Sequence, residues 1–471
     1  MTKAHRQINP AYGDVSLRDR RLVLILAVLT SLFGNMGFTG LNLGLPGMEK
    51  ELGLSAEQMA WVPLSTFMAM AMMAAPGAKL ADIYGRRRTS LIAFAICLVS
   101  LCAGALAWDA YSLLSSRVMT GLGLAVAFTN VTAMVTSVHP PEVRGRVLGF
   151  SIASVYIGLS LGPVVCGYLV GWAGWRAIFW LSFLGFLPPM AIALMVKVEQ
   201  RPAKGEPLDK NGAFLWAAAV FTVFMGLTRI SDLPEGPVSV LLGLLLAAAY
   251  VKSSLKSANP VLDVRLFTGS RRFAFSSLAA FISYSASTGC GLILSLYLQY
   301  TKQLPVDKAG LLLMVQPVCQ ALVTPFTGRL SDKVDAGLMA SAGMGIICLA
   351  LTILALALEP DTPYPVFLSI TMLMGVGFAT FGAPNTNAII GSAPPDKIGQ
   401  ASGTITATRL CGQVFSVAVT TLVFRLVIGP GRISEDKYPA FMSAATVCFS
   451  IFAPLCFTGI LASIARGRKK K

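Results

Sequence analysis

The most constraining feature of this sequence is a series of apolar runs of about twenty residues, which recur from one end of the chain to the other. A helix of that length spans the roughly 30 Å of hydrocarbon in a bilayer. Hydrophobic residues make up 55% of the chain and charged residues only 13%, whereas a soluble domain carries about 25% charged residues. The sequence therefore predicts an all-α membrane protein.

Fourteen membrane spans are expected from these runs. An even number would place both ends of the chain on the same side of the membrane. The expected spans are 22–46, 57–77, 89–108, 111–137, 146–171, 176–196, 212–230, 237–253, 273–300, 308–328, 337–358, 364–390, 399–427 and 439–464.

The distribution of basic residues predicts which side that is, because cytoplasmic loops carry an excess of lysine and arginine. If residues 1–21 form a cytoplasmic tail, the segments on that side hold 28 of the 38 basic residues, including a basic tail at 466–471, and the opposite segments hold 8. We therefore expect both termini in the cytoplasm and the protein in the cytoplasmic membrane. Topology also accounts for the net charge of +16, so no nucleic acid partner is expected.

The chain resembles itself at an offset of about 254 residues. The segment HPPEVRGRVLG at 139–149 aligns with APPDKIGQASG at 393–403. Parallel repeats that enclose a central site are typical of transporters. The expected organisation is an N-terminal six-helix half at 22–200, two inserted helices at 201–257 and a C-terminal six-helix half at 258–465.

The segment GAKLADIYGRRR at 77–88 resembles the loop between helices 2 and 3 of the major facilitator superfamily. Residues that match the family pattern are Asp82, Gly85, Arg86 and Arg87, with Gly328, Asp332 and Lys333 in a second copy. The resemblance implies a conformational switch, in which an aspartate at a helix end pairs with an arginine across the boundary between the halves. A tight cytoplasmic turn with topology-setting arginines would explain the same residues.

The fourth expected span contains RVMTGLG at 117–123, which resembles a family pattern that begins with Arg and ends in Gly-x-Gly. A charge at mid-helix costs roughly 2.5–3.5 kcal/mol on insertion scales. Arg117 is therefore expected to face a cavity or a partner. The alternative is that its side chain extends to the nearby membrane surface.

The fifth expected span contains GLSLGPVVCGYL at 158–169, which resembles a motif that the family associates with export. The matching residues are Gly158, Gly162, Pro163 and Gly167. Small residues let two helices touch closely, and proline adds a kink. Ordinary helix packing is the alternative interpretation.

Two further segments resemble the fourteen-helix drug:proton antiporter branch of the family, the multidrug efflux type. They are WRAIF at 175–179 and GQASGTITATRLCGQ at 399–413, which contains Arg409. The resemblance implies the major facilitator fold and a monomeric exporter of small organic molecules, drugs or metabolites, that works by alternating access. An uptake permease for an anionic or neutral metabolite is the alternative, and the proton is the candidate coupling ion.

The chain departs from that branch in its charges. Multidrug members usually carry an Asp in helix 1, nine residues before a proline, and this chain has Gly37 there. All 22 acidic residues lie in loops or at helix ends, so Arg117 and Arg409 are the charges expected at membrane depth. By Coulomb's law such an interior should favour anionic or neutral substrates over cations.

Other polar residues within the spans are candidates for the substrate cavity or for ordinary hydrogen bonds between helices. These are Asn42, Asn130, Gln316, Gln320, Asn385, Asn387 and Gln413. No cluster of catalytic groups and no phosphate-binding GxxxxGK[ST] loop is present in the sequence, so neither an enzyme nor a direct ATP-driven pump is expected. No cofactor or metal is expected, and a membrane sensor is the least supported alternative.

Overall fold

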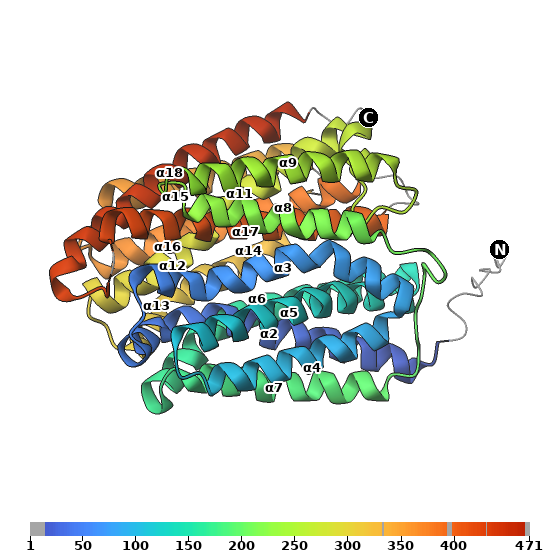
Figure 1. The fold of residues 1–471 in the computed structure, drawn as a ribbon, viewed down its shortest axis with the longest axis horizontal. Helices are drawn as coiled ribbons and strands as arrows, with labels where there is room; N and C mark the ends of the chain where they lie inside the picture. Colours follow the sequence, from blue (N-terminus) through green and yellow to red (C-terminus); the bar gives the residue numbers. More distant parts are fainter. Residues whose placement is uncertain (1–14, 332–333, 393–397, 430, 467–471) are drawn as a thin grey trace.

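The protein is described by a computed structural model that covers residues 15–331, 334–392, 398–429 and 431–466. Within these ranges, fourteen helices or helix pairs are long and apolar enough to cross a membrane. They lie side by side along one direction, with both ends of the chain at the same end of the bundle (Figure 1). All fourteen expected spans and the all-α fold class are confirmed.

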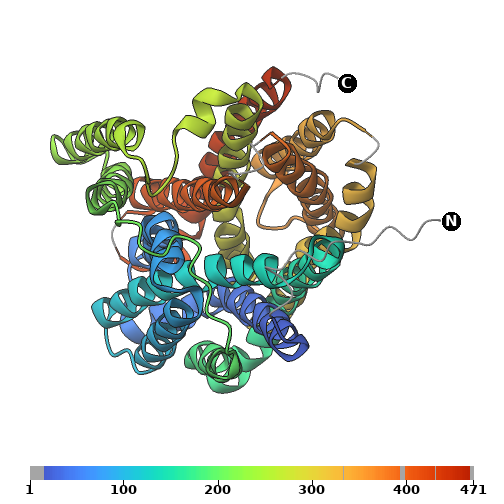
Figure 2. The ribbon, with the colours of Figure 1, turned by 90° about the vertical axis from the view of Figure 1, so that its right-hand side faces the viewer.

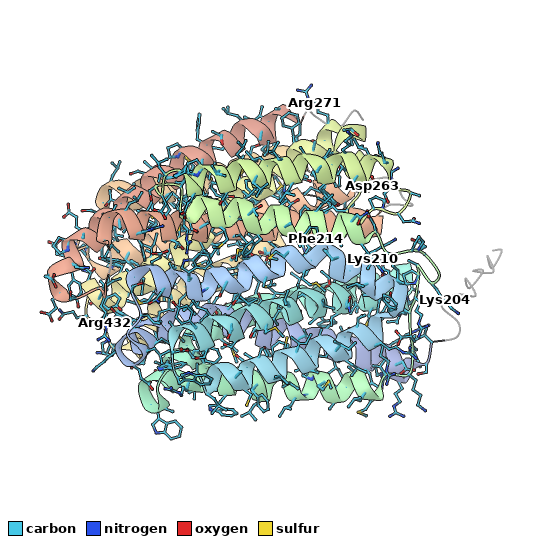
Figure 3. The ribbon with its side chains drawn as sticks, in the orientation of Figure 1. Lys204, Lys210, Phe214, Asp263, Arg271 and Arg432 are labelled. Atoms are coloured by element: carbon cyan, nitrogen blue, oxygen red, sulfur yellow. The ribbon has the colours of Figure 1, made fainter. Side chains whose placement is uncertain are left out.

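We call the end that carries the chain termini the terminal end, and the other end the distal end. Lys204 lies at the terminal end and Arg432 at the distal end (Figure 3).

The N-terminal half consists of six long helices that pack on one another. They are α2 (Leu17–Leu52), α3 (Ala56–Tyr84), α4 (Arg86–Ala105), α5 (Ala110–Val138), α6 (Pro141–Ala173) and α7 (Arg176–Met195). Capping residues set where α3 and α5 begin. Ser55 forms a capping box with Gln58, and Asp109 forms one with Ser112. Hydrogen bonds from Ser112 also hold the pKa of the Asp109 carboxyl below its usual value.

Two helices, α8 (Lys210–Thr228) and α9 (Glu235–Lys256), follow as a hairpin. Seen from the terminal end, the hairpin lies on the flank of the bundle (Figure 2). The α8 helix packs on α3 of the N-terminal half and on α17 of the C-terminal half. Trp216 of α8 donates from its indole nitrogen to the Ala71 carbonyl at 3.0 Å. The hairpin therefore covers one seam between the halves.

The C-terminal half holds the remaining elements of the described chain. These are α10 (Arg265–Gly269), α11 (Arg271–Ser285), α12 (Thr288–Leu296), the π-helix η1 (Tyr297–Thr301), α13 (Val306–Leu313), α14 (Val315–Ser331), α15 (Ala336–Ala357), α16 (Tyr364–Ile390), α17 (Ile398–Val423), the π-helix η3 (Phe424–Ile428), the 3₁₀-helix η4 (Glu435–Lys437) and α18 (Tyr438–Ala465).

Two of the expected spans are not single helices. The ninth is broken between α11 and α12, where the sequence SYSASTGCG has little helix preference, and the tenth is interrupted at Met314. At the first break the Gly289 amide donates to the Ser416 hydroxyl of α17 at 2.8 Å. A break in a membrane helix is tolerated where a neighbouring side chain satisfies the freed backbone group.

The glycines of the Gly-Pro motif lie in very close helix contacts. A methyl group on Gly158 would lie 2.4 Å from the Leu32 carbonyl oxygen of α2, and one on Gly162 would lie 2.1 Å from the Thr39 hydroxyl. Nearer the distal end, a methyl group on Gly167 would lie 2.9 Å from the carbonyl oxygen of Val306, at the start of α13. These glycines let α6 pack closely on α2 of its own half and on α13 of the other half.

The Pro163 carbonyl oxygen of α6 is the nearest neighbour of Gly310 on α13. A methyl group on Gly310 would lie 2.1 Å from this oxygen. The motif therefore makes backbone contacts across the boundary between the halves as well as within the N-terminal half.

Replacing Gly162 by Ala should lower the stability of the protein by about 1–3 kcal/mol, because the added methyl group must displace Thr39 or the α2 backbone. The measurement is the unfolding temperature of the purified protein in detergent. Gly171→Ala in the same helix is the control, since no atom lies within 4 Å of a methyl group there. Equal unfolding temperatures for the two variants would contradict the close packing.

Candidate functional site

Arg409 of α17 lies among polar and aromatic side chains of the C-terminal half. Its Nη2 donates to the Thr386 hydroxyl of α16 at 2.5 Å. The guanidinium carbon lies 5.5 Å from the centre of the Tyr284 ring of α11, a cation–π distance. In the described chain no carboxylate forms an ion pair with Arg409. The arginine is held by a hydroxyl and a ring, both uncharged.

A tyrosine from the N-terminal half completes this group. Tyr156 of α6 lies close to Gln320 and Thr324 on α14 and near Tyr284 and Arg409. We call Tyr156, Tyr284, Gln320, Thr324, Thr386 and Arg409 the central cluster. It joins five helices from both halves, α6, α11, α14, α16 and α17, which is the location expected of a site that alternates between the two sides of a membrane.

Sequence reasoning identified Arg409 but not the tyrosines that surround it. Tyr156 and Tyr284 stand in apolar stretches where an aromatic residue is usually packing, and they are 128 positions apart. The sequence feature that could have indicated them is a tyrosine, an aromatic residue with a hydroxyl group, inside each of these two apolar spans. Only the fold brings these residues to the same arginine.

Arg117 lies elsewhere, inside the N-terminal half. It is 5% exposed, and its guanidinium carbon lies 5.7 Å from the centre of the Phe179 ring. It lines a small cavity of about 20 Å³ between α2, α4, α5 and α7. The prediction that Arg117 faces a cavity agrees with this position, but the cavity is separate from the central cluster. The alternative, extension to the membrane surface, is wrong because the side chain is buried.

Of the other polar candidates, Gln320 belongs to the central cluster, whereas Asn42, Asn130, Gln316 and Asn385 lie outside it. Asn130 donates to the Thr89 hydroxyl at 2.8 Å, and Asn385 donates to the Ser276 carbonyl at 3.0 Å. These two asparagines join neighbouring helices near the terminal end. Asn42 of α2 lies against Gly291 of α12, across the boundary between the halves.

Gln316 is the fourth of these candidates. It lies on α14, four residues before Gln320 of the central cluster and therefore on the same face of the helix. Its side chain is half-buried.

Asn385 also takes part in a second arginine site at the terminal end. Arg466 donates to the Asn385 side-chain oxygen at 3.1 Å and to the Gly337 carbonyl at 2.6 Å. Burial lowers the pKa of Arg466 to about 10, so the side chain stays charged at neutral pH. This network ties the end of α18 to α15 and α16.

The switch residues of the N-terminal half form a compact cluster at the terminal end. The Arg86 guanidinium pairs with Asp82 at 2.9 Å and donates to the Ala133 carbonyl and the Ser137 hydroxyl of α5 at 3.0 and 3.2 Å. These contacts tie the start of α4 to the ends of α3 and α5. Within the described residues, the expected pairing of Asp82 across the two halves is not present, because Arg86 occupies the carboxylate from its own half.

Gly85 and Arg87 extend this cluster to α7. Gly85 has φ +114°, a conformation that favours glycine, and a methyl group there would collide with the Glu199 carboxylate. The Arg87 amide donates to that carboxylate at 3.0 Å. Its side chain donates to the carbonyls of Ala193 and Leu194 at the end of α7.

The second copy of the switch is only partly described. Gly328 lies on α14 with no atom within 4 Å of a methyl group built on it. Asp332 and Lys333 lie outside the described residues, so their predicted role stays a prediction.

A buried carboxylate joins the two halves at the distal end. Glu49 of α2 is 6% exposed. It accepts hydrogen bonds from the Tyr300 hydroxyl of η1 and from the Ile433 amide at 2.9 Å. The Ala56 amide of α3 donates to the Gly431 carbonyl at 3.0 Å. We call these contacts the distal clasp. Sequence reasoning did not predict this contact, because Glu49 stands next to Lys50 and Glu51 in a segment that resembles an exposed helix end.

A larger, apolar cleft of about 480 Å³ lies between the inserted hairpin, α11 and α17. Thr408 and Cys411 of α17 line it, and they flank Arg409 in the sequence. The α17 helix therefore separates this cleft from the central cluster. The aromatic residues of the cleft are Trp216, Phe224, Tyr250, Phe267 and Phe281.

Comparison with known proteins connects this architecture to one family. The family model of the Major Facilitator Superfamily matches residues 25–255 and 276–471. The riboflavin transporter RibZ of Clostridioides difficile is 23% identical over 96% of this chain and 99% of its own length. The cephamycin export protein CmcT of Amycolatopsis lactamdurans is 27% identical over 90% of this chain and 89% of its own.

Solved structures show the same fold at lower identity. A POT family transporter in complex with 5-aminolevulinic acid is similar with a TM-score of 0.70 and 15% identity, over 93% of this chain and 96% of that one.

Replacing Tyr300 by Phe should open the distal end more often. The substitution removes the hydroxyl donor to Glu49, and a hydrogen bond to a charged group is worth about 1.5–3 kcal/mol, which corresponds to roughly a 10- to 100-fold shift in the equilibrium. The measurement is the distribution of distances between spin labels at Tyr111 and Ser443, two exposed positions at the distal ends of α5 and α18, in a chain without native cysteines.

The control is Tyr438→Phe, which removes the hydroxyl of a neighbouring tyrosine. The ring centres of Tyr438 and Tyr300 lie 6.0 Å apart. If both variants gave the distance distribution of the parent, the distal clasp would not hold the halves together.

Proposed function

This chain belongs to the Major Facilitator Superfamily and is a multi-pass secondary transporter, and we propose that it exports small neutral or anionic organic molecules by alternating access. The observation that carries this proposal is the central cluster. It presents a guanidinium and several hydroxyls to the boundary between the two halves, without a carboxylate partner.

The charge of the central cluster supports the proposed substrate class. Export of cations in exchange for protons normally depends on a carboxylate at membrane depth, which binds the proton and the cation in turn. The described carboxylates of the spans lie near helix ends. Examples are Glu49 at the distal end of α2 and Asp82 at the terminal end of α3. Arg409 would attract an anionic group or donate hydrogen bonds to a neutral one.

The direction of transport is supported by a relative and by a motif. The relative from Amycolatopsis lactamdurans is named as an export protein. Gly158, Gly162 and Gly167 form the close helix contacts of the motif associated with export. No observation favours uptake over export, and the family match gives no support for an enzyme or a sensor.

The conformation fits one state of an alternating-access cycle. The distal clasp closes the boundary between the halves at one end. If the terminal end faces the cytoplasm, as the excess of basic residues there indicates, the clasp closes the outer side, and the cytoplasmic side is the proposed entry for the substrate. We place the protein in the cytoplasmic membrane with both termini inside.

The switch cluster of Asp82 and Arg86 would change partners during the cycle. In the present state it fastens α3, α4 and α5 to one another within the N-terminal half. We propose that closure of the terminal end brings the second copy at 328–333 against it. A proton is the proposed coupling ion, and a monomer is the proposed transporting unit, because each chain contains both halves.

Flux into liposomes tests the proposal and the role of Arg409. With the purified protein reconstituted and a pH gradient imposed, labelled anionic and neutral compounds should be transported in preference to cationic dyes. Arg409→Ala should reduce anion flux at least tenfold, because a charge-assisted hydrogen bond and its Coulomb attraction are lost, and Arg409→Lys should retain part of it.

Arg21→Ala, at an exposed position of α2 outside the switch and the central cluster, is the matched control and should leave flux unchanged. Transport of ethidium that survives replacement of both Arg117 and Arg409 by Ala would overturn the anionic or neutral substrate class. Absence of flux for every class of compound would overturn the transporter itself.

A further inference from the structure

The guanidinium of Arg117 is a buried charge that the proposed transport mechanism does not use. In the described chain no carboxylate pairs with it, and its Nε has no hydrogen-bond partner. The hydrogen bonds of the described residues include the Arg117 carbonyl, which accepts from Thr66 at 3.2 Å, but none from the guanidinium. A buried charge without a counter-charge is strongly unfavourable, so a partner is expected.

Among the described residues that line the cavity with Arg117, none carries a negative charge. Two hydroxyls line the same cavity, Thr120 and Ser182. The Ser182 hydroxyl donates to the Ile178 carbonyl at 2.9 Å, and Thr120 bonds the Ser116 carbonyl at 2.8 Å. The remaining lining residues are Phe33, Gly34, Gly37, Phe38, Leu41, Leu101, Leu124, Ile178, Phe179 and Phe186.

The cavity is too small for an organic molecule. Its volume of about 20 Å³ corresponds to one or two water-sized spheres. It is enclosed by α2, α4, α5 and α7 of one half, so it does not belong to the central cluster.

We propose that this cavity binds a single halide-sized anion, chloride under physiological conditions, as the counter-ion of Arg117. The anion would contact the guanidinium in the cavity that Arg117 lines. The site stabilises the N-terminal half and is independent of the substrate that the transporter carries.

Gly37 explains why the cavity has room. A methyl group on Gly37 would lie 2.9 Å from the Ser182 hydroxyl, and both residues line the same cavity as Arg117. An Asp at position 37 would bring a carboxylate to this cavity and take the place of the anion. Glycine at this position leaves the arginine without an internal partner and leaves space for an external one.

The test is thermal unfolding of the purified full-length protein in detergent, with chloride replaced by gluconate at constant ionic strength. A ligand that binds only the folded state raises the unfolding temperature in proportion to the logarithm of its concentration above Kd. The wild-type protein should become more stable with chloride and with bromide, in a saturable way. Arg117→Gln should lose this response, and Arg409→Gln, the matched control, should keep it.

Two further variants address the case in which Arg117→Gln does not fold. Gly37→Asp should unfold at the same temperature in chloride and in gluconate, because its carboxylate replaces the anion. Gly37→Asn has nearly the same shape without the charge and should keep the halide response if the cavity still admits the ion. A halide response in Gly37→Asp equal to that of the wild type would overturn the proposal.

Anomalous diffraction from crystals grown in bromide gives an answer that does not depend on any variant. The expected result is one bromide peak within contact distance of the Arg117 guanidinium. No peak there, or a wild-type protein whose stability is the same in chloride and gluconate, would overturn the site. Failure of the liposome flux experiment would leave these results unaffected, so the two proposals are tested separately.

Discussion

The constraint on which the rest of this structure depends is the cost of holding a charge in a medium that cannot solvate it. The chain satisfies this constraint by having its acidic residues at helix ends or in loops and two arginines, Arg117 and Arg409, within the membrane spans. Arg409 is held by a hydroxyl and an aromatic ring at the boundary between the halves. Arg117 is enclosed within one half. Arginine therefore occurs in two settings. Arg409 lies at the boundary between the halves, and Arg117 lies inside the N-terminal half.

A second constraint is the absence of a hydrophobic driving force between helices in a bilayer, which leaves close packing and polar contacts to hold them together. The α6 helix meets it with glycines. Gly158 and Gly162 bring it against α2, and Gly167 brings it against α13. The distal clasp adds a buried carboxylate, Glu49, that is satisfied only while the halves are together. Packing within a half is thus tight and permanent, whereas contact between halves depends on a few polar groups that can exchange partners.

The sequence predicted the fourteen spans because hydropathy is a local property that a helix of fixed length must satisfy. It did not predict the central cluster, since Tyr156 of the N-terminal half meets Tyr284 and Arg409 of the C-terminal half only after the two halves assemble. It also assigned Asp82 a partner in the other half, where the structure has Arg86 four residues away. A pattern of residues identifies a switch, but which partner it holds depends on the conformational state. The break between α11 and α12 was missed because its stabilising hydroxyl, Ser416, comes from a distant helix.

The inserted hairpin gives the molecule two unlike flanks. On one, α8 packs against α3 and α17 and covers the seam between the halves, with Trp216 bonded to the α3 backbone. On the other, α6 meets α13 and α14, and neither α8 nor α9 covers that contact. When the halves rock, the first seam shears against protein and the second against lipid. Bilayer thickness and stiffness would then act on the motion from one flank only, so the membrane would load the two seams unequally.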